Sequence, residues 1–264
     1  MIHLLYPSSP LRARRPDEQY AAEVEAMRDA GFEVSLFSLE NFQDGRFEVA
    51  SPVPAEARVL YRGWMLSAAE YSKLDEALNG QGTPLLVSSE EYLASHYLPN
   101  WYSQISEFTP ETQVFRADAD LVKELEQLGW EGFFIKDYVK SLKTSVGSRI
   151  STPEQVATLV NEMQKFRGRI EGGFCVRRIE NFKPDTERRY FVVEGVPHAA
   201  SGDVPQIVYK CAERLTQRFY SIDVIEQSDG EMRVVEVGDG QVSDLVGWEV
   251  GSFAAMMKEQ FGKP

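Results

Sequence analysis

The stretch SIDVIEQSDGEMRVVEVGDGQVSD, residues 221–244, contains two short, largely apolar segments separated by a turn sequence at residues 228–230. Apolar segments joined by a glycine-containing turn are typical of a β-hairpin. Folding about this turn brings Asp223 and Glu236 onto neighbouring strands. Both acids have apolar neighbours in sequence, where a strand with a buried face disfavours carboxylates. The stretch therefore raises the question of what the two acids bind.

A magnesium ion answers this question. Two adjacent carboxylates repel each other, and one of them is protonated unless a cation lies between them. Mg²⁺ takes hard oxygen ligands from one or two carboxylates and completes its shell with water and substrate phosphates. Asp239 follows in a Gly-Asp-Gly turn, where small neighbours let the backbone approach a ligand. We predict Asp223, Glu236 and Asp239 as metal ligands; the alternative is that Asp223 and Glu236 point to solvent on an exposed face.

A lysine-rich segment, FFIKDYVKSLKTSVGS (133–148), precedes the hairpin by about 80 residues. Lys136 ends an apolar strand, a position that rarely carries lysine without a partner. Lysines together with hydroxyl and glycine residues in one loop can contact a polyphosphate. We predict Lys136, Lys140 and Lys143 as phosphate-binding residues, with a solvated basic loop as the alternative. The segment is not a P-loop, because G-x-x-x-x-G-K-[ST] is absent.

Arginines cluster in RRIENFKPDTERRYFVVEG (177–195). Consecutive strand residues point to opposite faces, so one of Arg188 and Arg189 faces inward. An inward arginine is suited to clamp a carboxylate or a phosphate. The alternative is a structural ion pair with Glu187 or Glu180.

The composition narrows the class of protein. The 264 residues include 41 acidic and 28 basic ones, a formal net charge of −13, which argues against strong binding to nucleic-acid backbones. Cys175 and Cys211 are the only cysteines, too few for a disulfide framework or a zinc cluster. The N-terminal segment lacks the features of a signal peptide, and no apolar run approaches the ~20 residues of a membrane span. We expect a soluble, cytoplasmic protein.

The pattern of elements predicts an α/β (α+β) fold in three lobes. In residues 1–110, strands alternate with helices, which favours a parallel sheet; the predicted strands are 2–6, 32–39, 59–64 and 83–88, and the predicted helices are 17–30 and 67–80. No glycine fingerprint follows the first strand, so a dinucleotide is not expected there. The second lobe is predicted over 111–180 and the third, mainly β-structured, over 181–264.

On these motifs the sequence resembles the ATP-grasp superfamily over about residues 111–264. That family has a lysine at the end of a central-lobe strand, here FFIKD, and a hinge that contacts adenine, here FCVRRIE. An arginine strand (ERRYFVV) and two strands with magnesium acids (SIDVIE and VVEVGDGQ) follow in the same order. The arginine with Lys136 and Lys140 is most similar to a bacterial and phage branch of the superfamily. One departure is that Gly238 replaces the asparagine of the usual Glu-x-Asn, with Asp239 as its candidate substitute.

The resemblance implies two α/β lobes that sandwich ATP, preceded by a Rossmann-like, parallel-sheet pre-ATP-grasp lobe. It implies an ADP-forming ligase that joins a carboxylate to an amine or a thiol through an acyl phosphate. The substrates would be small molecules or peptides, with ATP and Mg²⁺ required. Arg189 and Lys140 would be catalytic, and the residues implied at the nucleotide are Lys136, Lys140, Lys143, Arg177, Arg178, Ile179 and Glu180.

Two other functions compete with this one. An RNA- or tRNA-directed ligase is disfavoured by the net charge of −13. A nucleotide-binding regulator with little turnover is consistent with the glycine at position 238. The sequence leaves the oligomeric state open, with a homodimer as one option.

Overall fold

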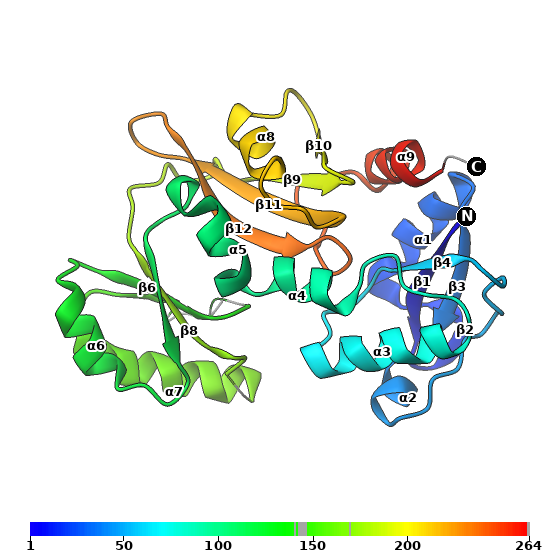
Figure 1. Cartoon of the computed structure of the whole chain (residues 1–264), viewed down its shortest axis with the longest axis horizontal. Helices are drawn as coiled ribbons and strands as arrows, with labels where there is room; N and C mark the ends of the chain where they lie inside the picture. Colours follow the sequence, from blue (N-terminus) through cyan, green and yellow to red (C-terminus); the bar gives the residue numbers. More distant parts are fainter. Residues whose placement is uncertain (140, 142–146, 169, 263–264) are drawn as a thin grey trace. The chain divides into compact units, whose positions relative to one another are not determined.

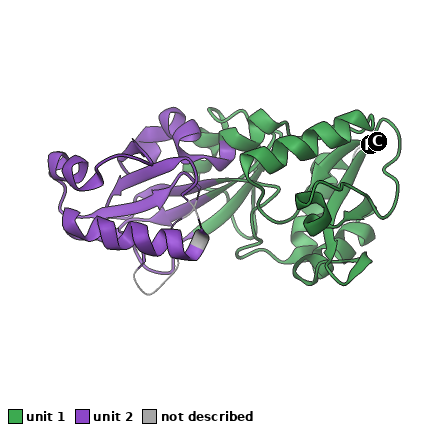
Figure 2. Cartoon of the chain, turned by 90° about the horizontal axis from the view of Figure 1, so that it is seen from below, with its two compact units in different colours: residues 1–94, 188–222, 238–264 green, residues 95–187, 223–237 purple. Residues whose placement is uncertain are grey.

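The computed structural model describes residues 1–139, 141, 147–168 and 170–262. In this part of the chain the strands form three four-stranded sheets (Figure 1). The strands of each sheet fall within one of the three ranges predicted as lobes. By packing, the chain forms two compact units: unit 1 comprises residues 1–94, 188–222 and 238–264, and unit 2 comprises residues 95–187 and 223–237 (Figure 2). The fold is the predicted mixture of helices and sheets.

The N-terminal sheet of unit 1 is built on β1 (Ile2–Ser9). β3 (Glu33–Phe37) and β4 (Arg58–Tyr61) pair with β1 in parallel, which confirms the predicted parallel sheet. Parallel neighbours need long crossovers, and these contain α1 (Ala21–Asp29), α2 (Leu39–Gln43) and a 3₁₀ turn at Glu18–Tyr20. α3 (Ala68–Gly80) begins at a capping box between Ser67 and Glu70.

Two segments of this region differ from the predicted elements. The strand predicted at 83–88 is wrong, because Leu85 makes only an isolated parallel bridge with Val59 before α4 (Ser89–His96) begins. β2 (Arg12–Pro16) was not predicted; it pairs antiparallel with the end of β1. Its residues are mostly exposed, so it lacks the apolar pattern by which strands are found.

A second sheet has the strand order β10-β9-β11-β12. β9 (Arg188–Val193) and β10 (Val196–Ala199) are joined at Glu194-Gly195, both with positive φ, as a tight hairpin turn requires. β11 (Phe219–Glu226) and β12 (Met232–Asp239) form the predicted hairpin. The boundary between the units crosses both of these strands. α8 (Gln206–Ala212) and α9 (Val250–Phe261) complete the C-terminal part of unit 1.

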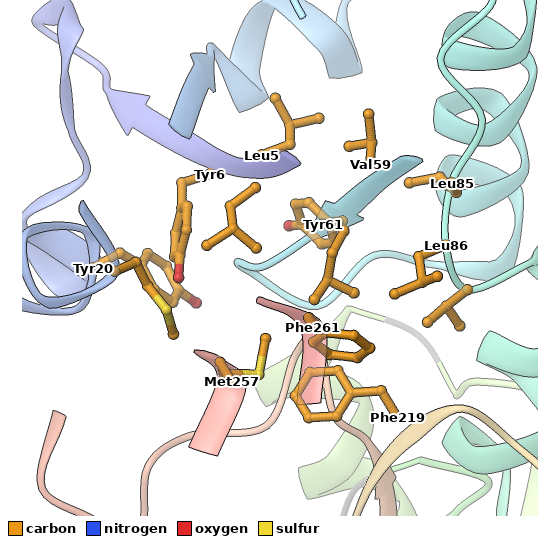
Figure 3. Close-up of a cluster of buried hydrophobic side chains, with 14 of the residues drawn as sticks. Leu5, Tyr6, Tyr20, Val59, Tyr61, Leu85, Leu86, Phe219, Met257 and Phe261 are labelled. Atoms are coloured by element: carbon orange, nitrogen blue, oxygen red, sulfur yellow. The ribbon is translucent and has the colours of Figure 1, made fainter. Parts of the chain in front are cut away.

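Unit 1 has one core that joins distant parts of the chain (Figure 3). Leu5 and Tyr61 of the N-terminal sheet belong to the same buried cluster as Phe219 of β11 and Met257 and Phe261 of α9. Burying an aliphatic or aromatic side chain stabilises the fold by about 1.5–3 kcal/mol. The core therefore fixes the segment after β12 to the N-terminal sheet.

Unit 2 contains an antiparallel sheet of order β5-β8-β6-β7. Its strands are β5 (Thr112–Arg116), β6 (Phe133–Asp137), β7 (Arg149–Ile150) and β8 (Gly173–Arg178). α6 (Leu121–Leu128) and α7 (Val156–Arg167) pack on it through a core that includes Leu125, Leu159 and Val176 (Figure 1). α5 (Leu98–Ile105) and 3₁₀ turns at Ser106–Phe108 and Pro153–Gln155 complete the described elements.

No helix in the described part of the chain has the length and apolar character that a membrane crossing requires.

Candidate active site

Lys136 and Glu236 form an ion pair in unit 2. Lys136 lies near the end of β6, and its side chain is only 5% exposed. Its Nζ donates to Oε1 of Glu236 on β12 at 2.8 Å. The Glu236 side chain is 40% exposed. The buried lysine thus has the partner that its position demands, and this partner is one of the two acids of the hairpin.

Asp223 lies on β11, the strand next to β12 in the sheet. The hairpin therefore carries Asp223 and Glu236 on neighbouring strands, as predicted. Asp223 is 4% exposed, so the alternative in which both acids point to solvent is wrong for Asp223. A buried carboxylate beside a half-exposed one is an unfavourable pair without a cation.

The donor set fits magnesium better than a transition metal. Within the described residues, no three His, Cys, Asp or Glu side chains lie close enough to hold a metal ion among themselves. Two carboxylates supply only hard oxygen ligands, and Mg²⁺ is the ion that accepts such a set because it keeps waters and substrate phosphates in its shell.

Arg177 of β8 holds β12 from the inside of unit 2. Its Nη1 donates to the carbonyl of Val235, next to Glu236, and its Nη2 donates to Oγ1 of Thr109. Its Nε has no hydrogen-bond partner among the described residues. Burial lowers the pKa of Arg177 to about 10, although the charge of Glu236 opposes this. The contacts of the Arg177 side chain serve to position the strand that carries Glu236.

The residues predicted at the hinge differ in their surroundings. Arg178 is exposed and lies 3.6 Å from Glu111. The carboxylate of Glu180 accepts two hydrogen bonds from Arg233, each at 2.9 Å, and a third from Gln227. Ile179 follows β8 directly and is half-buried. The Glu180 side chain is thus bound within unit 2.

Arg189 and Asp239 belong to unit 1 and are described with it. Arg189 is less exposed than Arg188, and its Nη1 donates to the carbonyl of Asp244 at 2.9 Å. Asp239 is fully buried at the end of β12. Its Oδ1 accepts from the main-chain N–H and from Nε2 of Gln241, at 2.9 and 3.1 Å. One Asp239 oxygen therefore has a defined role in closing the turn, and its role as a metal ligand stays a prediction.

Lys140 and Lys143 lie outside the described residues.

Sequence reasoning missed the residues that position the candidate site. Arg62 follows β4 and is 1% exposed, and the Glu180–Arg233 pair braces the segment after β8. The signal for Arg62 was present, since an arginine within the apolar segment VLYRGW needs a buried acceptor.

Solved structures with the same fold are ATP-grasp proteins. D-cycloserine synthetase DcsG has a TM-score of 0.64 at 15% identity and covers 98% of both chains. A RimK domain ATP-grasp protein from Sphaerobacter thermophilus has a TM-score of 0.62 at 18% identity, over 97% of this chain and 98% of that one. D-alanyl-alanine synthetase A from Vibrio cholerae has a TM-score of 0.64 at 12% identity, over 98% and 93%. These likenesses show the ATP-grasp fold.

A family described as an ATP-grasp domain, family 3 of the clade named for an arginine and two lysines, matches residues 127–259. The chain belongs to this family and is an ATP-grasp ligase. The predicted superfamily is thereby confirmed. No curated protein matches the chain in sequence.

Proposed function

We propose that this protein joins a carboxylate to an amine, or to a thiol, at the expense of ATP. The carboxylate oxygen attacks the γ-phosphorus of ATP and ADP leaves; the nucleophile then attacks the acyl carbon, and phosphate leaves with the nucleophile's proton released to solvent. The observation that carries the proposal is the arrangement in unit 2 of buried Lys136, its partner Glu236 and buried Asp223. A phosphate-binding cation and two metal acids are what phosphoryl transfer requires.

Asp223 and Glu236 would hold Mg²⁺, which neutralises charge on the phosphates when bound. Lys136 would bind a phosphate oxygen once it leaves Glu236, and its low exposure would strengthen that contact. Arg189, with its guanidinium held by the Asp244 carbonyl, would steady the transferred phosphoryl group. The segment Arg178–Glu180 would read the adenine edge through its backbone.

The substrates would be small carboxylic acids or peptides. Structures of the same fold carry the names of a D-cycloserine synthetase, a D-alanyl-alanine synthetase and a ligase, PsnB, complexed with a precursor peptide. An RNA-directed ligase is less favoured, because the net charge of −13 repels a nucleic-acid backbone.

The test is a screen of amino acids and peptides for acceptor-dependent nucleotide turnover, with the spent nucleotide separated by chromatography. We expect ADP and phosphate. Acceptor-dependent AMP and pyrophosphate would overturn the acyl-phosphate route, and slow ATP hydrolysis that ignores every acceptor would favour the regulator.

Asp223→Asn and Glu236→Gln should each lower turnover by on the order of a hundredfold or more, since each removes a metal carboxylate worth several kcal/mol. Glu231→Gln is the matched control, because Glu231 lies in the same hairpin with an exposed side chain. Equal activity in all three variants would remove the metal site from the proposal.

A further inference from the structure

Arg62 is a buried cation with an unusually complete set of acceptors in unit 1. It is 1% exposed, and its Nε and Nη2 donate to the two carboxylate oxygens of Glu23 at 2.7 and 3.0 Å. Tyr6 donates to the same carboxylate at 2.8 Å. Phe253 lies against the guanidinium, 5.0 Å from ring centre to Cζ. Burial acts to lower the pKa of Arg62, but Glu23 and Tyr6 outweigh it, so that the pKa is raised and the cation is kept.

The remaining nitrogen of Arg62 binds the segment that follows β12, which we call the 239–244 loop. Nη1 donates to the carbonyls of Gly240, Gln241 and Ser243 at 3.1, 3.1 and 2.6 Å. The main-chain N–H of Gly63 also donates to Gln241. One side chain thus fixes three carbonyls within four residues.

The rest of the 239–244 loop is held by its own polar groups. Ser243 donates to the carbonyl of Asp239 at 2.8 Å and lies 2.8 Å from the hydroxyl of Ser221. Gln241 contacts both Asp239 and Tyr71. The loop ends at Asp244, whose carbonyl accepts from Arg189. A chain of contacts therefore runs from Glu23 through Arg62 and the loop to Arg189.

This network is costly if its only purpose is stability. Burying an ion pair costs desolvation energy that an apolar pair of similar volume avoids. Only a guanidinium fork, however, can bind a carboxylate on one side and several carbonyls on the other. The geometry thus favours placement of the loop, rather than filling of the core, as the role of Arg62.

We propose that Arg62, itself held by Glu23, is a positioning residue for the ligase reaction. It fixes the 239–244 loop so that the Asp244 carbonyl holds the guanidinium of Arg189 where the transferred phosphoryl group develops charge. The placement of the loop rests on the contacts above, while its role in turnover rests on the proposed function.

Arg62→Lys tests the placement of the loop. Lysine keeps the positive charge beside Glu23 but lacks the fork that reaches the three carbonyls. Hydrogen exchange should become about tenfold faster at Gly240 and Val242, whose N–H groups donate to Phe219 and Asp239. Arg58→Lys is the matched control, because Arg58 lies four positions earlier, on β4, and is exposed. Unchanged exchange in Arg62→Lys would overturn the placement.

Turnover and nucleotide binding test the role in the reaction. In Arg62→Lys, kcat should fall about tenfold or more while the KM for ATP and the affinity for a non-hydrolysable analogue stay within about twofold, because the proposed nucleotide contacts lie in unit 2. A parallel loss of both, or a kcat equal to that of Arg58→Lys, would overturn it. If Arg62→Lys does not fold, Glu23→Gln is measured in the same way. A wild-type protein without turnover would refute the proposed function, and the exchange result would still decide the placement.

Discussion

Lys136 and Glu236 contact each other, although the proposed function gives them different ligands, a phosphate group and Mg²⁺. An ammonium held by a carboxylate is less available to phosphate, and the carboxylate itself repels an anion. With Mg²⁺ present, the same carboxylate becomes a ligand that attracts the nucleotide. The effect of Glu236 on nucleotide affinity should therefore depend on the metal.

Glu236→Gln should bind a non-hydrolysable ATP analogue about three- to tenfold more tightly than the wild type in EDTA, and more weakly by a similar factor with Mg²⁺, where tenfold is about 1.4 kcal/mol. Calorimetric titrations in both buffers measure this crossover, with Glu231→Gln as the control. Affinities that change in the same direction with and without Mg²⁺ would contradict the assignment of Glu236.

The sequence predicted which residues of the candidate site to examine but not how they contact one another. Asp223, Glu236 and Lys136 were found because each is a charged residue in an apolar strand, which needs a partner. Lys136 and Glu236 are 100 residues apart, and no local pattern connects them. The contacts of Arg177 and Arg62 were missed for the same reason, since their acceptors are mostly main-chain carbonyls, which any residue can supply.

Among the strands and helices, those with strong local signals were predicted well. The β11–β12 hairpin has a turn with Gly230 at positive φ, and α6 starts at the capping residue Asp120 and ends before Gly129, also at positive φ. β2 and β5 were missed because neither has a continuous apolar face. The segment 83–88 is apolar like a strand, but apolar character alone does not provide a pairing partner.

Arg177 links β8 to β12, and its loss should destabilise unit 2. Arg177→Met leaves the Val235 carbonyl and the Thr109 hydroxyl without their donor, which should lower the free energy of unfolding by about 2–4 kcal/mol. Urea unfolding measures this change. Arg178→Met, at the exposed next residue of the same strand, should stay within about 0.5 kcal/mol of the wild type. Equal effects of the two substitutions would contradict this role of Arg177.

For the molecule as a whole, packing follows segments that are far apart in sequence. Unit 1 combines the N-terminal sheet with β9, β10 and α9, and its shared core makes these parts interdependent. His3 on β1 and His198 on β10 both belong to this unit. Burial lowers the pKa of each, against the opposing charges of Glu33 for His3 and Glu259 for His198. Two histidines thus report on the proton linkage of one unit.

This linkage predicts that acid destabilises unit 1 before its carboxylates titrate. Because both folded-state pKa values lie below the ordinary histidine value of 6.5, the unfolded chain binds more protons than the native one as the pH falls below 6.5. The stabilisation is therefore complete above this pH and is lost below it. Each histidine contributes at most about 1.4 kcal/mol per pH unit, and half-buried His198 contributes less than His3.

Urea unfolding between about pH 7.5 and about pH 5.5 measures this loss in the wild type. His3→Gln should remove part of the pH dependence, and the double variant with His198→Gln should remove most of it, because glutamine does not titrate. His3 also accepts or donates a hydrogen bond at Ser35, so His3→Gln should lower the stability at every pH and reduce the slope. A double variant that keeps the slope of the wild type would assign the acid sensitivity to other groups, the carboxylates of the buried networks first among them.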